Sequence, residues 1–196
     1  MKEADIWIGG YYELTIEFQQ GLSEGQMLVM STIVKQEPAF VGFYKERADL
    51  YVEAAPLLHE LTAHKSLYGM IQLARGQQLP CVVEVLKVAG EADYLHIAIP
   101  QGSLEDQFPY QYPLSKKSNS WLAVIDEWFI VLAKAIYEEI PFEGALIGEE
   151  VSGLQVEEVT VEHLAYMSWI VPFEKGKQVV SWGQGQELTK DLMIYR

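Results

Sequence analysis

The chain has 196 residues, with 14 Lys plus Arg against 28 Asp plus Glu, so its formal charge is −14 with the four His neutral. This length suits one large domain or two small ones, and a content of 49% apolar and 21% charged residues indicates a folded chain rather than a disordered one. The excess of acids over bases excludes a basic nucleic-acid-binding surface, because phosphate neutralisation requires Lys and Arg.

The N-terminal residues and the cysteine content indicate a cellular compartment. Glu3 and Asp5 stand where a secretory signal would need its apolar core. The most apolar helical stretch, residues 121–137, contains charged side chains, so we expect no membrane-spanning segment. Cys81 is the only cysteine, which excludes an internal disulfide and a thiolate zinc cluster. We therefore expect a cytoplasmic protein in a reducing compartment.

The first 45 residues predict a strand, a helix and a second strand. Residues 6–18 are rich in β-branched and aromatic side chains, and apolar and polar residues alternate along their second half. Ser23 and Gln26 have the spacing of a capping box, which predicts the start of a helix that Pro38 ends. Residues 39–45 predict the second strand.

The next stretch contains the clearest hairpin signal of the chain. Residues 49–65 are ambiguous, although several apolar positions suit one face of a helix, and residues 68–74 predict a strand. Residues 80–88 and 93–99 predict a β-hairpin, with Gly90 supplying the positive φ that its turn requires.

A long helix is expected after a long loop. Residues 100–120 predict the loop, and the helix over residues 121–139 has Ser118, Asn119 or Ser120 as its cap and Pro141 as its stop. Its apolar stripe consists of Ile125, Phe129, Leu132 and Ile136.

The C-terminal part of the chain predicts mainly strands. Residues 143–149 read as a strand, Thr160 as the cap of a short helix through residue 167, and a final β-region follows. Its segments are residues 170–173, 179–182 and 188–195. Because strands and helices do not alternate strictly, we expect an α+β fold, a mixed and mainly antiparallel sheet with helices packed on one face. A single domain over residues 1–196 is expected. The alternative is a chain of two halves that meet at the loop over residues 100–120.

No motif of metal, thiol or cofactor chemistry is complete. His59 and His64 are five residues apart, whereas a zinc-binding helix needs His residues four apart on one face, so we expect no metal site and no cofactor. His96 stands in the hairpin strand, either as a base on a rigid element or on the wet face of the sheet. Cys81 lacks the context that would lower a thiol pKa and is expected to be a buried structural residue.

Carboxylates are abundant in one part of the sequence. Residues 126–162 contain ten acids and one base, Lys134, which accounts for most of the excess charge. Such a cluster either attracts a basic partner or only keeps a protein soluble.

The first functional hypothesis is a non-enzymatic binding protein that engages a basic protein through this acidic surface. Small acidic bacterial cytosolic proteins of this kind include antidote or immunity-type proteins that neutralise a basic toxin, although this is a likeness of composition alone. The aromatic loop near residue 110 would add contact area. The expected binding surface consists of Glu138, Glu139, Glu143, Glu150, Glu157, Glu158, Tyr110 and Tyr112.

Two other hypotheses compete with it. A hydrolase using paired carboxylates, for example on a glycan, would use Glu149 as acid or base with a partner such as Glu84. An oligomeric structural module would use the helix over residues 121–139 as a two-fold interface, through Trp121, Trp128 and Phe129.

Overall fold

The structure is a computed structural model, and it describes residues 6–19, 21–51, 61–63, 65–73, 76–87, 90–177 and 185–196. The strands are β1 (Tyr11–Phe18), β2 (Phe40–Tyr44), β3 (Leu67–Gln72), β4 (Gln78–Lys87), β5 (Asp93–Pro100), β6 (Gly144–Glu149), β7 (Ser168–Pro172), β8 (Gln186–Thr189) and β9 (Leu192–Tyr195). The α-helices are α2 (Glu24–Gln36), α3 (Gln101–Gln107), α4 (Leu122–Glu139) and α5 (Phe173–Gly176). The short 3₁₀ helices are η1 (Arg47–Tyr51), η2 (Val156–Glu158) and η3 (His163–Ala165).

The described strands form one nine-stranded sheet in the order β2-β3-β4-β5-β1-β6-β7-β9-β8. Each neighbouring pair in this order is antiparallel. A parallel contact occurs as an isolated bridge between Ala63 and Val85. The α+β class and the mainly antiparallel sheet are therefore confirmed.

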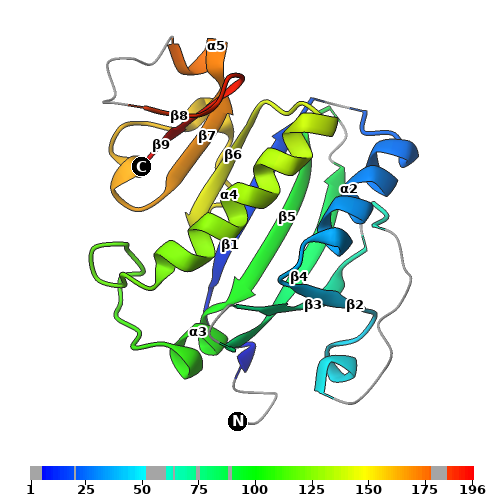
Figure 1. The fold of residues 1–196 in the computed structure, drawn as a ribbon, viewed down its shortest axis with the longest axis vertical. Helices are drawn as coiled ribbons and strands as arrows, with labels where there is room; N and C mark the ends of the chain where they lie inside the picture. Colours follow the sequence, from blue (N-terminus) through cyan, green and yellow to red (C-terminus); the bar gives the residue numbers. More distant parts are fainter. Residues whose placement is uncertain are drawn as a thin grey trace.

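The two long helices cover one face of the sheet (Figure 1), where α2 and α4 lie side by side. Alternation along β1 directs Leu14 and Ile16 to this face, where they join a large apolar core with Met30 of α2 and Phe129 of α4. All four side chains are fully buried. This packing confirms the helices on one face and fixes which side of each strand remains free of helices.

The opposite face is named the helix-free face because α2 and α4 do not cover it. It is partly covered by the segment that joins β6 to β7, which contains the short 3₁₀ helices η2 and η3. Its apolar residues form a second, smaller core with Leu146 of β6 and Trp169 of β7. The segment is also held by carboxylates of β1, since Glu13 accepts a hydrogen bond from the Ser152 N–H at 2.9 Å and Glu17 accepts one from the Val156 N–H at 2.9 Å. Strand β1 is therefore buried on both faces along most of its length.

Predictions from local pattern are confirmed for most elements. Ser23 and Gln26 form the capping box at the start of α2, and this helix ends at Gln36, shortly before Pro38. Strands β4 and β5 pair as the expected hairpin, with φ of +86° at Gly90. The apolar stripe of α4 is buried as expected.

Three local predictions are wrong. Residues 101–107 form helix α3 instead of loop. The N-cap of α4 is Trp121, without a side-chain cap, and Asn119 instead uses its amide to bond Gln111 on the neighbouring loop. The helix expected from Thr160 to residue 167 is reduced to the single turn of η3.

Some predictions lie outside the described residues. These include the histidine pair, His59 and His64, and the strand over residues 179–182. In the described part of the chain, no helix combines the length and the apolar character needed to cross a bilayer.

We expect Gly69→Ala to lower the free energy of unfolding by about 1–3 kcal/mol, the usual effect of overpacking a core. A Cβ atom at Gly69 would lie 2.9 Å from Cε2 of Phe40 and 3.0 Å from Sγ of Cys81, both of which are buried. Urea denaturation measures the effect, and Gly153→Ala is the matched control because no atom lies within 4 Å of its Cβ. Equal stability of the two variants would contradict the packing described for β2, β3 and β4.

Candidate binding site

Three neighbouring strands bring polar side chains together on the helix-free face. Thr15 of β1 lies directly opposite His96 of β5, and His96 lies directly opposite Glu84 of β4. Directly paired residues of adjacent strands project to the same side of a sheet. Glu13, two residues before Thr15, projects to this side as well. The register therefore assembles the group from residues far apart in the sequence.

His96 lies between two carboxylates. Its Nδ1 is 3.2 Å from Oε1 of Glu84, and its Nε2 is 3.2 Å from Oε1 of Glu13. The second contact is an ion pair without hydrogen-bond alignment at Nε2. Glu84 also accepts a hydrogen bond from the Ser66 hydroxyl at 2.8 Å. His96 and Glu13 are 8% and 2% exposed, so both charges are largely removed from water.

The two carboxylates keep His96 charged. Burial alone lowers the pKa of His96, but the attraction of Glu13 and Glu84 outweighs burial and raises this pKa to about 9. In return, the hydrogen bond with His96 lowers the pKa of Glu84. An imidazole that is already protonated at neutral pH is not available to accept a proton. This arrangement disfavours His96 as a catalytic base.

A pocket of about 230 Å³ opens beside this group. The sheet contributes Thr15, Leu86, Tyr94 and His96, the β4–β5 turn contributes Glu91, and the β6–β7 segment contributes residues 152–155. The hydroxyl of Thr15 is buried and has no hydrogen-bond partner within the described residues. A buried polar atom is normally paired, so this hydroxyl lacks a partner that a ligand can supply.

Negative charge surrounds Tyr94, which is part of the pocket wall. Burial raises the pKa of Tyr94, and the charges of Glu17, Glu91 and Glu158 raise it further. These three acids come from β1, the β4–β5 turn and η2, so their convergence results from the fold and not from sequence proximity. The pocket has an electrostatic environment suited to a cation.

In the described segments, no group of three or more His, Cys, Asp or Glu side chains has the geometry to hold a metal ion. Glu13 is instead engaged by Ser152 and His96.

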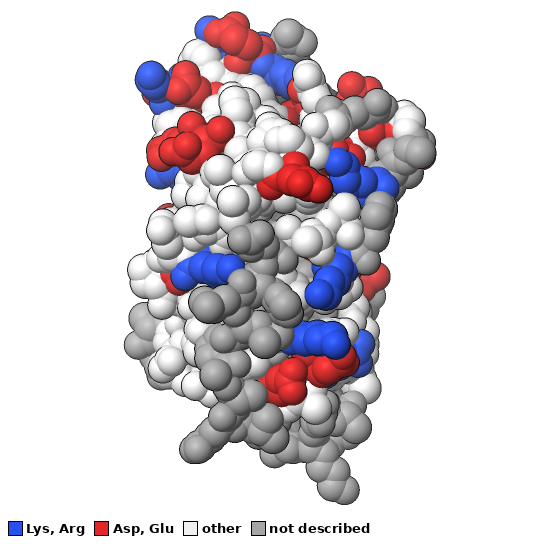
Figure 2. All heavy atoms as spheres, turned by 90° about the vertical axis from the view of Figure 1, so that its right-hand side faces the viewer, with Lys and Arg blue, Asp and Glu red and all other residues white. Residues whose placement is uncertain are grey.

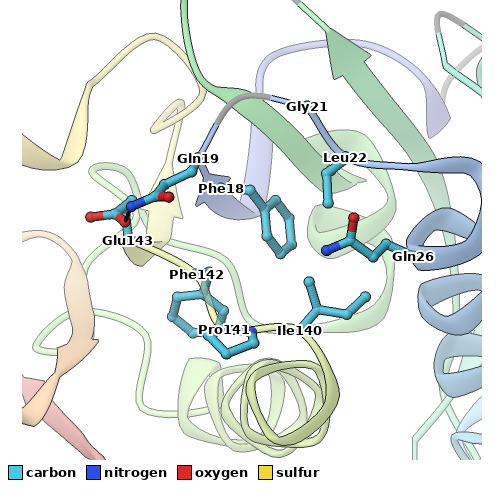
Figure 3. Close-up of a pocket in the computed structure, with 9 residues that line it drawn as sticks. All are labelled: Phe18, Gln19, Gly21, Leu22, Gln26, Ile140, Pro141, Phe142 and Glu143. Carbon is cyan, nitrogen blue, oxygen red and sulfur yellow. Dashed lines mark hydrogen bonds between the residues drawn. The ribbon is translucent and has the colours of Figure 1, made fainter.

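A second hollow lies between the ends of α2 and α4 and has a volume of about 290 Å³. Figure 3 shows the side chains of Phe18, Leu22 and Ile140 directed toward its centre. Its polar groups are already paired, because Gln26 belongs to the capping box and Glu143 binds Gln19 and Lys175. This hollow contains no buried polar side-chain atom without a partner among its lining residues, and it is the weaker candidate.

Glu149 and Glu150 occupy structural positions at the end of β6. Glu149 accepts a hydrogen bond from Nε2 of Gln101 at 2.6 Å, and Glu150 accepts one from the Tyr11 N–H at 2.8 Å. Glu149 alternates in phase with Ile147, which faces the helices, whereas Glu84 pairs with His96 on the other face. Glu149 and Glu84 therefore lie on opposite faces and do not form the catalytic pair considered from the sequence.

The other predicted acids do not form one continuous surface. Glu138 and Glu139 are exposed at the end of α4, whereas Glu157 and Glu158 are exposed in η2 on the other side of the sheet. Glu143 is half-buried and paired with Lys175. Figure 2 shows that on the side carrying α2 and β2, Lys and Arg are interspersed with Asp and Glu.

Most of the aromatic side chains predicted to contact a partner pack against other residues of the chain. Tyr110 packs against the main core, whereas Tyr112 is 78% exposed. Trp128 and Phe129 are buried, and Trp121 stacks on Phe108 with ring centroids 4.4 Å apart. Two of the three aromatic side chains proposed for a two-fold interface are therefore buried within the chain, and Trp121 is half-buried.

Sequence reasoning missed Thr15, Tyr94 and Glu91 as members of one site. The available signal was a row of polar residues, Glu13, Thr15 and Glu17, inside a strand whose other residues are apolar. This alternation identifies a face but not the strands beside it. The contact partners on β4 and β5 follow only from the strand order.

Comparison with known proteins yields no relative: no protein-family model, curated protein or solved structure matches this chain.

Proposed function

We propose that this chain is a non-enzymatic binding protein that engages a basic protein through the helix-free face of its sheet. The observation that carries the proposal is the convergence of Glu17, Glu91 and Glu158 around Tyr94, beside a pocket whose Thr15 hydroxyl has no partner in the part of the chain that the structure describes. Like-signed charges around a concave site attract an oppositely charged partner and accelerate association. The overall charge of −14 acts in the same direction.

The hydrolase hypothesis receives less support. His96 is held as an imidazolium between two carboxylates, and Glu149 is bonded to Gln101 on the other face. His96 therefore cannot accept a proton at neutral pH from a molecule in the pocket, and Glu149 is not among the residues described as lining that pocket. A toxin antidote remains one form that a binding protein of this kind would take.

The proposal is tested by removing two charges from this face. We expect Glu91→Gln/Glu158→Gln to weaken binding of the basic partner at least about tenfold, mainly through slower association. Glutamine at position 158 preserves the capping interaction with the Gln155 N–H, since Glu and Gln serve equally in a capping box. The partner is captured by crosslinking in the producing cells, and its association rate is then measured with the purified proteins.

The matched control is Glu138→Gln/Glu139→Gln, which changes the net charge equally but lies at the end of α4. We expect this control to reduce association much less. Salt provides a further check, because the screening length falls from about 30 Å at 0.01 M to about 8 Å at 0.15 M ionic strength. Equal loss in both variants, or capture of no basic protein, would remove the proposal.

A further inference from the structure

The pocket beside Thr15 has the features of a receptor for one side chain. Thr15 is 5% exposed, and its Oγ1 has no hydrogen-bond partner within the described residues. The same residue lines the pocket, directly opposite His96 on the neighbouring strand. An unpaired buried hydroxyl is unfavourable relative to a bonded one. A ligand group that bonds this oxygen would recover that cost.

The walls of the pocket suit an aliphatic stem. Leu86 and Leu154 contribute apolar surface from β4 and from the β6–β7 segment, and Tyr94 contributes an aromatic ring from β5. Lysine and arginine side chains bury their methylene groups along such surfaces while their charged ends find polar partners. A ring face also attracts a cation.

The charges at the pocket favour a positive end group. His96 lines the pocket as an imidazolium, and its two carboxylate partners, Glu13 and Glu84, lie outside the lining; the three side chains together carry one negative charge. Glu17, Glu91 and Glu158 add negative charge around Tyr94. Among the described lining residues, the charged groups are the carboxylate of Glu91 and the imidazolium of His96, without any Lys or Arg. An anion is disfavoured, and an apolar group would leave the Thr15 hydroxyl unpaired.

We infer that this pocket receives a single lysine or arginine side chain of the basic partner, whose cationic end donates a hydrogen bond to Oγ1 of Thr15. The inference rests on the proposed function for the identity of the partner but not for the chemistry of the pocket. The cation contributes the donor that Thr15 lacks, and its stem packs between Leu86 and Leu154.

The pocket is tested with small probes, so that no partner is needed. N-acetyl-lysine amide and N-acetyl-arginine amide are titrated separately into the ¹⁵N-labelled chain, with N-acetyl-norleucine amide as the uncharged control. We expect saturable shifts of the Thr15, Tyr94 and Ser152 amides with at least one of the two cations and none with norleucine. Absence of saturation with both cations, or equal shifts with norleucine, would overturn the inference.

A substitution identifies the hydroxyl as the contact. We expect Thr15→Val to weaken binding of the cationic probe at least about fivefold, as expected for the loss of a hydrogen bond of about 1 kcal/mol. The variant should fold, because valine matches threonine in shape and removes an unpaired polar atom. Thr32→Val is the matched control, since the Thr32 hydroxyl donates a hydrogen bond to the Leu28 carbonyl on the exposed side of α2. Unchanged affinity in Thr15→Val would contradict the assigned contact.

The two proposals fail in different ways. If the cationic probes do not bind but Glu91→Gln/Glu158→Gln still loses a basic partner, the pocket inference is wrong and the proposed function stands. If the probes bind at Thr15 but no basic protein is captured, the proposed function fails and the pocket retains its assigned chemistry.

Discussion

Asp126→Ala is expected to lower the free energy of unfolding by about 3 kcal/mol, because it disrupts a buried network that joins four parts of the chain. Asp126 of α4 accepts a hydrogen bond from the Tyr12 hydroxyl of β1 at 2.5 Å and pairs with Lys116 at 2.9 Å. Lys116 in turn donates to the hydroxyl of Ser168 on β7 at 2.5 Å. Asp126, Tyr12 and Ser168 are at most 2% exposed.

The expected cost has two sources. Without the carboxylate, the Tyr12 hydroxyl is a buried donor with no acceptor, which costs about 1–3 kcal/mol. Lys116 also loses its counter-ion, but its side chain is 36% exposed, so water compensates for part of that loss. Burial raises the pKa of Tyr12 well above its ordinary value, and Asp126 raises it further, so the phenol remains protonated and able to donate.

Conservative variants separate the two sources. Asp126→Asn retains an acceptor for Tyr12 but loses the ion pair, and we expect about half the cost of the alanine variant. Tyr12→Phe removes the donor and leaves the pair between Asp126 and Lys116, so its cost should be about 1 kcal/mol. Urea denaturation of the three variants tests this order. A stability of Asp126→Ala within about 0.5 kcal/mol of wild type would show that the network contributes little.

Asp126 also shows why charge counts along a sequence do not define a surface. In the sequence it opens the acidic stretch over residues 126–162, and nothing nearby distinguishes it from the exposed Glu127. Its helical position places it between the buried Phe129 and Ile130, on the side of α4 that faces the sheet. The partners that make its burial tolerable, Tyr12 and Lys116, come from other elements. Their proximity is a property of the tertiary fold.

The elements predicted correctly depend on contacts that are local in sequence. The capping box of α2 joins residues three apart, and the β4–β5 hairpin depends on one turn. Helix α3 was missed because residues 101–107 have only one large apolar side chain, Leu104, and so no helical periodicity. The signal for that helix comes from its place after β5, where Leu104 enters the main core.

The candidate site was missed for a reason of register. The sequence predicts the hairpin strands at residues 80–88 and 93–99 but does not fix which residues pair across the turn. In the structure Lys87 pairs with Asp93, and Glu84 therefore lies opposite His96. A shift of one residue moves a side chain to the other face of a strand. The boundary of a turn, which sequence patterns define poorly, thus decides whether His96 meets a carboxylate.

Glu84→Gln is expected to destabilise the protein at pH 6 by about 1–2 kcal/mol and to lose much of this effect by pH 10. The cause is the pKa of His96, which rises from 6.5 to about 9 on folding. At about 1.4 kcal/mol per pH unit, this shift corresponds to about 3 kcal/mol of stability, shared between Glu13 and Glu84.

The sign follows from which state binds the proton more tightly. Because the folded state has the higher His96 pKa, the contribution is fully present below about pH 6.5 and is lost as the pH rises through about 9. The pKa of Glu84 is lowered on folding, so the contribution of Glu84 to stability is present above its ordinary value of 4.5 and is lost as the pH falls below that value. The carboxylate–imidazolium pairs should therefore stabilise the fold most between about pH 4.5 and about pH 6.5.

Two measurements test this expectation. NMR titration of the His96 ring should give a pKa near 9 in the wild type and a value about one unit lower in Glu84→Gln, where one of the two carboxylates is neutral. Urea denaturation should show that the free energies of unfolding of Glu84→Gln and the wild type differ less at pH 10 than at pH 6. Glu91→Gln is the control, since Glu91 is exposed and His96 pairs instead with Glu13 and Glu84, so the small effect of this variant should not change between pH 6 and pH 10. A His96 pKa near 6.5 in the wild type would contradict this expectation, because the ring would then be mostly neutral at pH 7 and would not compensate the charges of Glu13 and Glu84.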